Sequence, residues 1–142
     1  MNEYRVERIN DNHRNRFADL FSQCNFFRDE KTEPVLFMAL RNQTEMIPVG
    51  FIQLYSNCSP TNVVKTTIVY DLYVLPDYRQ KGIALNLIEV AVKFAIKNKS
   101  TLIQLETEKD NLIAQKLFES VGFKSQSSAS ELNVYSIQFE FD

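Results

Sequence analysis

The chain has 142 residues and a formal net charge of -2, and 44% of its residues are hydrophobic while 24% are charged. This composition is that of a folded globular protein and excludes a disordered chain, and the length predicts one domain over residues 1–142. The slight acidic excess argues against nucleic acid as a partner, because proteins that bind a phosphate backbone usually carry a marked basic excess.

Cysteine and histidine are scarce in this chain. Two cysteines, Cys24 and Cys58, follow no CxxC pattern, and with the single histidine, His13, they give too few ligands for a zinc cluster, so no metal is expected. The N-terminal segment has no hydrophobic stretch typical of a signal peptide, which favours two reduced thiols over a disulfide. No apolar run approaches the about 20 residues that span a membrane. We therefore expect a soluble, cytoplasmic protein with no membrane partner.

The first part of the chain predicts a strand followed by a helix. Apolar and charged residues alternate around Tyr4 and Val6, which is typical of a short strand. A helix capped by Asn10 or Asp11 is expected next. Its apolar face has four members at helical spacing: Phe17, Leu20, Phe21 and Cys24. His13 lies near that face, where we expect it to be structural rather than catalytic.

Three strands are expected in the middle of the chain. Val35–Leu40 is an apolar run of strand length. Val49–Tyr55 is a second strand, which begins at Gly50 after a turn at Met46–Pro48. Thr66–Leu75 has the strongest strand pattern, because β-branched and aromatic residues dominate it.

The second half alternates helices and strands. A long helix is expected to follow the third of these strands, and it is so apolar that we expect it to pack on a sheet. The next elements are a strand at Thr101–Thr107, a helix capped by Asp110 and ended by Gly122, a hairpin turn at Ser125–Ser130 and a final strand over residues 132–141. The element order predicts an α/β (α+β) domain.

The segment from Tyr70 to Ala84 carries the clearest chemical signal. It runs from a strand through Pro76 and Asp77 into the start of a helix, so it gathers backbone N–H groups and the positive end of a helix dipole at one point. Small residues at 82 and 84 leave room for an anion such as a diphosphate. The alternative is that Gly82 only turns the chain. The segment lacks the glycines of a P-loop or a dinucleotide-binding loop.

Two motifs in this order resemble the GNAT (general-control-type N-acetyltransferase) superfamily. Arg79-x-x-Gly82-x-Ala84 is similar to the family's R/Q-x-x-G-x-G/A pyrophosphate loop, and the preceding strand, which ends at Val74, also fits. The stretch from Asn111 to Phe123 resembles the family's N-x-x-A-x-x-L-Y-E-x-x-G-F signature, and Val49-Gly50-Phe51 matches a V-G-F/Y often found where the third strand starts. The resemblance implies the GNAT fold, a mixed twisted sheet of six to seven strands flanked by helices.

The resemblance also implies acetyl-coenzyme A (acetyl-CoA) as the acyl donor, and no metal. In the family this molecule lies between two splayed parallel strands, here Thr66–Leu75 and Thr101–Thr107. Backbone groups of the first strand would hold the pantetheine arm, and Asn111 would contact the same arm. Amides of the loop would bind the diphosphate. Lys81 and Lys116 either contact the phosphates or are ordinary surface residues. The implied binding residues are Leu72, Tyr73, Val74, Arg79, Gln80, Lys81, Gly82, Ile83, Ala84, Leu85, Asn111, Ala114 and Lys116.

Two departures from the family pattern concern the catalytic groups. The family's frequent general acid, the tyrosine of L-Y-E, is replaced by Phe118, which cannot donate a proton. Tyr70 stands where polyamine-type relatives have a glutamate, and it either bridges a water to the substrate or is a strand aromatic. Asp71 is a further candidate, and Glu106 either binds a cationic amine or faces solvent. Candidate replacement acids are Tyr73, Tyr78 and Tyr135.

The implied reaction is the direct transfer of an acetyl group, in a ternary complex, from acetyl-CoA to a primary amine of a small molecule or peptide. Because Phe118 replaces the usual acid, a second hypothesis is a non-catalytic module that senses acyl-CoA or binds a partner. An unrelated α/β interaction domain is a third hypothesis. Asp29, Glu30 and Glu33 either shape the acceptor pocket, as their segment often does in the family, or form a plain charged loop. A homodimer would suit the aromatic C-terminal strand.

Overall fold

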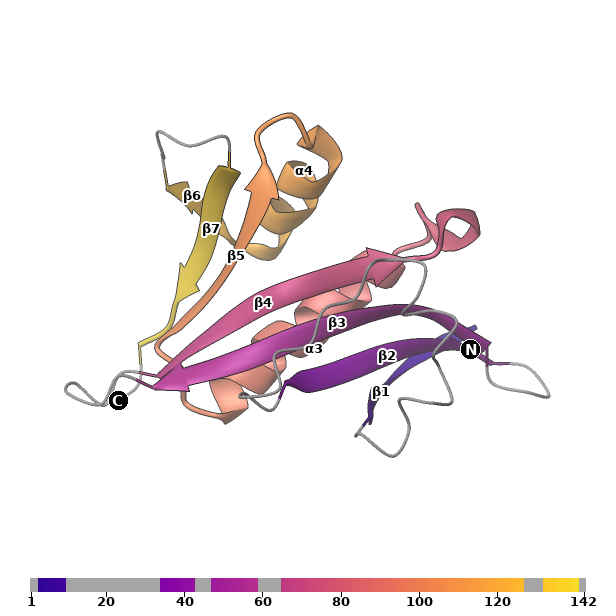
Figure 1. Cartoon of the computed structure of the whole chain (residues 1–142), viewed down its shortest axis with the longest axis horizontal. Coiled ribbons are helices and arrows are strands. Elements are labelled where there is room, and N and C mark those ends of the chain that lie inside the picture. The colour runs from indigo at the N-terminus through magenta and orange to yellow at the C-terminus, as the bar shows by residue number, and fades with distance from the viewer. Residues whose placement is uncertain (1–2, 10–33, 43–46, 59–64, 127–131, 141–142) are drawn as a thin grey trace.

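The computed structural model describes residues 3–9, 34–42, 47–58, 65–126 and 132–140. Within these ranges it has seven strands, one short 3-10 helix and two α-helices (Figure 1). The elements are β1 (Tyr4–Ile9), β2 (Val35–Arg41), β3 (Ile47–Cys58), β4 (Lys65–Val74), η2 (Pro76–Tyr78), α3 (Ile83–Lys97), β5 (Leu102–Glu108), α4 (Leu112–Val121), β6 (Lys124–Gln126) and β7 (Leu132–Gln138).

The strands form one mixed sheet in the order β1-β2-β3-β4-β5-β7-β6. Only β4 and β5 run parallel among the described neighbours, and every other described pair is antiparallel. α3 follows β4 and lies across the back of the sheet as drawn in Figure 1, which is how a helical crossover joins two parallel strands. The predicted α+β fold with a mixed sheet is thereby confirmed.

The main core lies between the sheet and the helices. α3 contributes Leu87, Ile88, Ala91 and Ala95, which are all fully buried, and this apolar stripe explains the helical periodicity of the sequence. Phe118 of α4 and strand residues of the same sheet face belong to the same cluster. Each fully buried leucine or isoleucine contributes about 1.5–3 kcal/mol relative to an exposed one. A smaller cluster on the opposite face comprises Ile9, Leu36, Met38, Leu40 and Phe51.

Two local expectations about β3 are wrong. Ile47 and Pro48 belong to the strand and do not form a turn, and Gly50 is an interior residue of the strand. A Cβ atom at Gly50 would lie 2.8 Å from the carbonyl oxygen of Tyr73 on β4. Glycine is therefore required there by the close approach of the neighbouring strand, not by the start of an element.

The capping residue of α4 also differs from the expectation. Asn111, not Asp110, is the N-cap, and its side chain accepts a hydrogen bond from the N–H of Ala114. Gly122 ends α4 with φ 114°, as predicted. No helix in the described ranges is long and apolar enough to cross a membrane.

Several expectations concern residues outside the described ranges. They include the helix expected after Asn10, His13, Cys24, the charged residues Asp29, Glu30 and Glu33, and the side chain of Cys58. The expected hairpin turn at Ser125–Ser130 is wrong at its start, because Ser125 and Gln126 form β6.

The strands β4 and β5 separate after a short ladder, and this separation creates the gap that concerns function. They pair only at Thr66 with Leu102, Thr67 with Ile103 and Ile68 with Gln104, and they then diverge into a V whose open side faces η2 (Figure 1). The register of β4 against β3 slips at the same level, because Leu54 pairs with Val69 while Gln53 pairs with Asp71. Tyr70 is therefore the extra residue of a β-bulge, a feature that bends a strand and is common beside active sites.

Candidate active site

Backbone groups of β4 face the gap beyond the bulge. The N–H of Leu75 donates to the carbonyl oxygen of Val49 at 2.9 Å, so residue 75 bonds toward β3. In an antiparallel ladder the bonding direction alternates, so Tyr73 also bonds toward β3, whereas the N–H and C=O groups of Leu72 and Val74 point toward the gap. Because β5 has already diverged, these groups, except the C=O of Val74, form an unpaired strand edge within the sheet.

Arg79 closes the turn that follows β4. Its Nε donates to the carbonyl oxygen of Val74 at 2.8 Å, and its guanidinium lies 5.6 Å from the centre of the Tyr73 ring. The N–H of Arg79 also donates to the carbonyl oxygen of Pro76. The loop is thereby fixed to the end of the strand.

The start of α3 presents amides without a capping side chain. Gln80 and Gly82 both adopt positive φ, 62° and 85°. Gly82 is the N-cap, no side chain bonds to the first turn, and that turn holds no acidic residue. Within the described part of the chain, the N–H groups of Gly82, Ile83, Ala84 and Leu85 have no hydrogen-bond partner. A Cβ atom at Gly82 would meet no atom within 4 Å, so the space beside Gly82 is open.

A cavity of about 690 Å³ fills the splay between β4 and β5. It brings together Tyr70, Glu106 and Asn111, which the sequence had singled out separately. On β5, Gln104, Glu106 and Glu108 alternate with core residues and so share the sheet face opposite the helices. The full lining is Ile68, Val69, Tyr70, Gln104, Leu105, Glu106, Thr107, Glu108, Asn111 and Leu132.

Tyr70 is held by a neighbour that sequence reasoning missed. Its side chain is 51% exposed, and its ring stands edge-on to that of Tyr55 with 5.3 Å between the centroids. Tyr55 in turn accepts a hydrogen bond of 2.7 Å from Nε2 of Gln53. Gln53 and Tyr55 are two residues apart on β3, so their alternation was a signal that both share one face, but only the strand pairing shows that this face is that of Tyr70.

Asp71 is next to Tyr70 but does not line the cavity. Its Oδ2 atom is buried and has no hydrogen-bond partner among the described residues. Burial raises the pKa of this carboxyl above its ordinary value, because a charged group loses hydration there. Asp71 is therefore a better proton acceptor than an ordinary aspartate.

Phe118 and the candidate replacement acids do not line the cavity of the splay. Phe118 is 5% exposed, and its ring packs 6.1 Å from Phe123 and 5.8 Å from Tyr135, both centroid to centroid. Tyr73 packs beside Phe51, and the hydroxyl of Tyr78 accepts a hydrogen bond from Arg41. None of Tyr73, Tyr78 and Tyr135 lines the cavity of the splay.

The remaining expected binding residues fall into two groups. Asn111 lines the cavity while its Oδ1 caps α4, and Ala114 donates the capping hydrogen bond. Lys81 and Lys116 are exposed, and neither has an ion pair in the described ranges.

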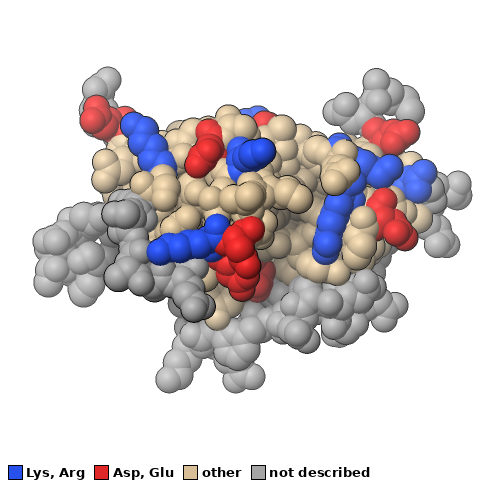
Figure 2. All heavy atoms as spheres, turned by 90° about the horizontal axis from the view of Figure 1, so that it is seen from above, with Lys and Arg blue, Asp and Glu red and all other residues tan. Residues whose placement is uncertain are grey.

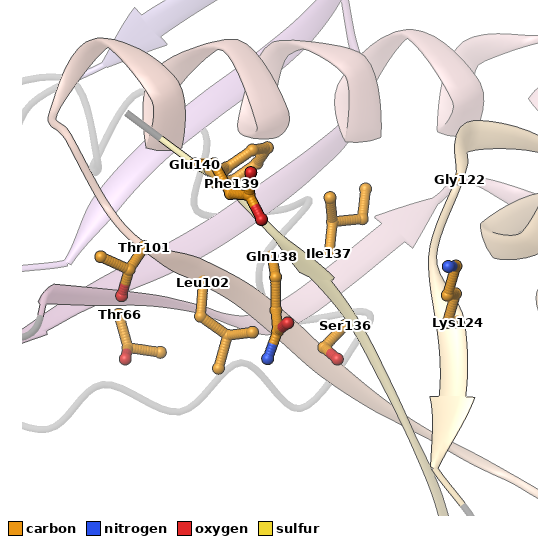
Figure 3. Close-up of a pocket in the computed structure, with 10 residues that line it drawn as sticks. All are labelled: Thr66, Thr101, Leu102, Gly122, Lys124, Ser136, Ile137, Gln138, Phe139 and Glu140. Atoms are coloured by element: carbon orange, nitrogen blue, oxygen red, sulfur yellow. The ribbon is translucent and has the colours of Figure 1, made fainter. Parts of the chain in front are cut away.

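Another cavity on the described surface has a similar volume. A second cavity, of about 700 Å³, lies along β5 and β7 and includes none of the expected site residues (Figure 3). Acidic and basic side chains are interspersed on the face drawn in Figure 2. No group of three or more potential metal ligands occurs among the described residues.

Comparisons with known proteins agree with this geometry. A model of the Acetyltransferase (GNAT) family matches residues 2–123. The chain is also 32% identical over 100 residues to a Bacillus subtilis (strain 168) protein named uncharacterized N-acetyltransferase YhfO. The matched residues cover 70% of this chain and 65% of that relative, so the match spans less than two thirds of the relative's length.

Two solved structures share the fold at low sequence identity. Arabidopsis thaliana Naa50 in complex with the bisubstrate analogue CoA-Ac-MVNAL has a TM-score of 0.78 and 19% identity, with 97% of this chain and 100% of that chain covered. Arabidopsis thaliana NAA60 in complex with acetyl-CoA has a TM-score of 0.74 and 17% identity, with 94% and 96% covered. Because the family model matches most of the chain, residues 2–123, we conclude that this chain belongs to the GNAT family of acetyltransferases.

Proposed function

We propose that the protein is an N-acetyltransferase that moves an acetyl group from acetyl-CoA to a primary amine of a small molecule or peptide. The observation that carries this proposal is that two sets of unsatisfied backbone groups flank the short loop after β4. One is the edge of β4 at Leu72 and Val74, and the other is the uncapped start of α3 at Gly82–Leu85.

The residues present fit acetyl-CoA. An extended pantetheine arm carries amides that can pair with the β4 edge as an added strand does. The free amides at the start of α3 suit a diphosphate, because donors and the helix dipole both favour an anion there. Asn111 lines the cavity between β4 and β5, and its Nδ2 group remains available while Oδ1 caps α4. Acetyl-CoA, when bound, supplies a thioester whose carbonyl carbon is open to attack by an amine.

The chain's own residues have to deprotonate the acceptor and hold it. A primary amine is mostly protonated at neutral pH and must be neutral to attack. We assign proton removal to Asp71, whose raised pKa makes it the stronger base, acting through water because its carboxylate does not line the cavity. Glu106 and the ring of Tyr70 line the cavity and would hold a cationic acceptor.

None of the candidate replacement acids, Tyr73, Tyr78 and Tyr135, lines the cavity of the splay, so we propose no replacement for the family's acid at position 118. A thiolate is a good leaving group, so water can protonate it as it departs. The absence of an acid at Phe118 supports the alternative, a non-catalytic module that binds acyl-CoA. The ring of Phe118 packs against Phe123 and Tyr135, which suits a purely structural role. In that alternative, Phe118→Tyr creates no activity.

A thermal-shift titration followed by a thiol-release assay tests the proposal. Acetyl-CoA and CoA should raise the melting temperature, and longer acyl-CoA species show how long an acyl chain is accepted. At least one compound in a panel of amines and peptides should release free thiol from acetyl-CoA. Absence of any thermal shift contradicts the proposal, and a shift without thiol release from any acceptor favours the non-catalytic module.

Location and assembly complete the proposal. We expect the protein in the cytoplasm, where acetyl-CoA is available, and as a homodimer. Light scattering coupled to gel filtration tests the second expectation, and a monomeric mass contradicts it.

A further inference from the structure

We infer that Arg79 is a positioning residue, which shapes the groove for acetyl-CoA by binding to β4 and does not itself bind the phosphates. The inference rests on the proposed function, since it concerns the loop that would hold the diphosphate. An arginine in such a loop would ordinarily be taken for a phosphate ligand, because its fork of donors matches phosphate oxygens.

The contacts of Arg79 point back into the protein. Nε donates to the carbonyl oxygen of Val74 at 2.8 Å, and the guanidinium is stacked over the ring of Tyr73. That ring packs 6.2 Å from Phe51, a residue of the buried cluster on this sheet face. A chain of contacts therefore runs from the core through Tyr73 to the guanidinium.

The bond to Val74 has a specific consequence for the strand edge. The carbonyl group of Val74 faces the gap, where it would otherwise be left without a partner. Arg79 satisfies it, so the edge offers the N–H of Val74 and both groups of Leu72. Arg79 thus decides which backbone groups remain for a ligand.

The same residue sets the direction of the loop. The N–H of Tyr78 donates to Leu75 and that of Arg79 donates to Pro76, so the backbone and side chain of Arg79 tie η2 to the end of β4. The amides of α3 begin three residues later. Loss of the Arg79 side chain would therefore displace the strand edge and the amides together.

Lys81 is the matched contrast within this loop. Both side chains are exposed, but among the described residues Lys81 has no hydrogen bond or ion pair, whereas Arg79 is bonded to Val74. The contribution of Lys81 to a bound phosphate would be charge alone, which salt screens.

Three variants and two ligands test the inference. Binding of CoA and of acetyl-pantetheine, which has no phosphate, is measured by NMR titration for wild type, Arg79→Lys, Arg79→Gln and Lys81→Gln at low and high salt. Arg79→Lys keeps the charge but loses the Nε–H. We expect both Arg79 variants to weaken CoA and acetyl-pantetheine by a similar factor of about ten, the effect of one such hydrogen bond, with unchanged salt dependence. Lys81→Gln should weaken only CoA and reduce its salt dependence.

The opposite pattern overturns the inference. If Arg79→Lys binds like wild type while Arg79→Gln loses affinity for CoA alone and with a weaker salt dependence, Arg79 is a phosphate ligand. Circular dichroism and melting of the unliganded variants show that each is folded. Hydrogen exchange at the N–H of Leu75 gives a readout without ligand, which Arg79 variants should accelerate and Lys81→Gln should not. Failure of wild type to bind CoA contradicts the proposed function instead.

Discussion

The two described α-helices begin in opposite ways. α4 starts at Asn111, whose own side chain accepts the N–H of Ala114 at 3.2 Å. α3 starts at Gly82, which has no side chain, and none of its first four amides has a partner in the described ranges. An Asn cap in place of a Gly cap is worth about a few tenths of a kcal/mol, so α3 forgoes a little stability that α4 obtains.

This difference indicates which helix start is available to bind a ligand. An open helix start is costly unless water or a ligand satisfies the amides. At α3 the open start coincides with positive φ at Gln80 and Gly82 and with empty space at Gly82. We therefore assign the anion site to α3 and expect α4 to be indifferent to anions at its first turn.

The strongest test places a charge at Gly82. Asp and Asn have the same shape and are the L-residues that best tolerate positive φ, so Gly82→Asp and Gly82→Asn carry the same strain and differ by one charge. Gly82→Asp should weaken acetyl-CoA by more than 100-fold through repulsion of the diphosphate, and Gly82→Asn by much less. Calorimetric titration measures both.

Gly122 is the control for backbone strain. It also has positive φ, and a Cβ atom there would meet nothing within 4 Å. Gly122→Asn should lower the melting temperature about as much as Gly82→Asn while affinity for acetyl-CoA stays at the wild-type value. Equal affinities of Gly82→Asp and Gly82→Asn would place the anion elsewhere.

A second test removes the cap of α4. Asn111→Ala should destabilise the protein by about 1 kcal/mol, because the N–H of Ala114 loses its acceptor. Asn111→Asp keeps the cap but replaces the Nδ2 donors by an acceptor, so stability should be retained while affinity for acetyl-CoA falls. Denaturant unfolding and calorimetry separate these effects. Retained affinity in Asn111→Asp would limit Asn111 to capping.

The smallest expected effect concerns Asp71. Its carboxylate is a hydrogen-bond acceptor without a described partner, whereas the start of α3 has donors without partners. Its pKa is raised above the ordinary 3.8 by burial, so the folded state binds this proton more tightly than the unfolded state. The contribution of Asp71 to the free energy of unfolding is therefore at its maximum below pH about 4, and it is lost as the pH rises through the raised pKa. Asp71→Asn should therefore raise the melting temperature at pH 7 by about 1–3 °C, with the gain vanishing toward pH 4. A gain that is independent of pH would contradict this origin.

The sequence predicted what depends on neighbours along the chain. The strand at Thr66–Leu75, the helix that begins after Gly82 and the end of α4 at Gly122 follow from periodicity and from glycine's tolerance of positive φ. The loop of Arg79 to Ala84 was recognised because its spacing is local.

Features set by strand pairing could not be predicted. The bulge at Tyr70 exists only as a register slip against β3, and the need for Gly50 comes from the carbonyl of Tyr73. The bond of Arg79 to Val74 and the contact of Tyr55 with Tyr70 likewise depend on tertiary geometry. Asp110 and Asn111 are equally able to cap, and the turn that bonds Asn111 to Glu108 decides between them.

The early divergence of β4 from β5 also bears on aggregation. An unpaired strand edge normally invites a strand of another molecule. Here the edge at Leu72 and Val74 looks into a V that is closed at one end by the three residue pairs of the parallel ladder. A strand of a second protein would have to fit its side chains between β4 and β5, whereas a thin extended molecule needs less space. The sheet can therefore keep a reactive edge open for a small ligand while shielding it from other proteins.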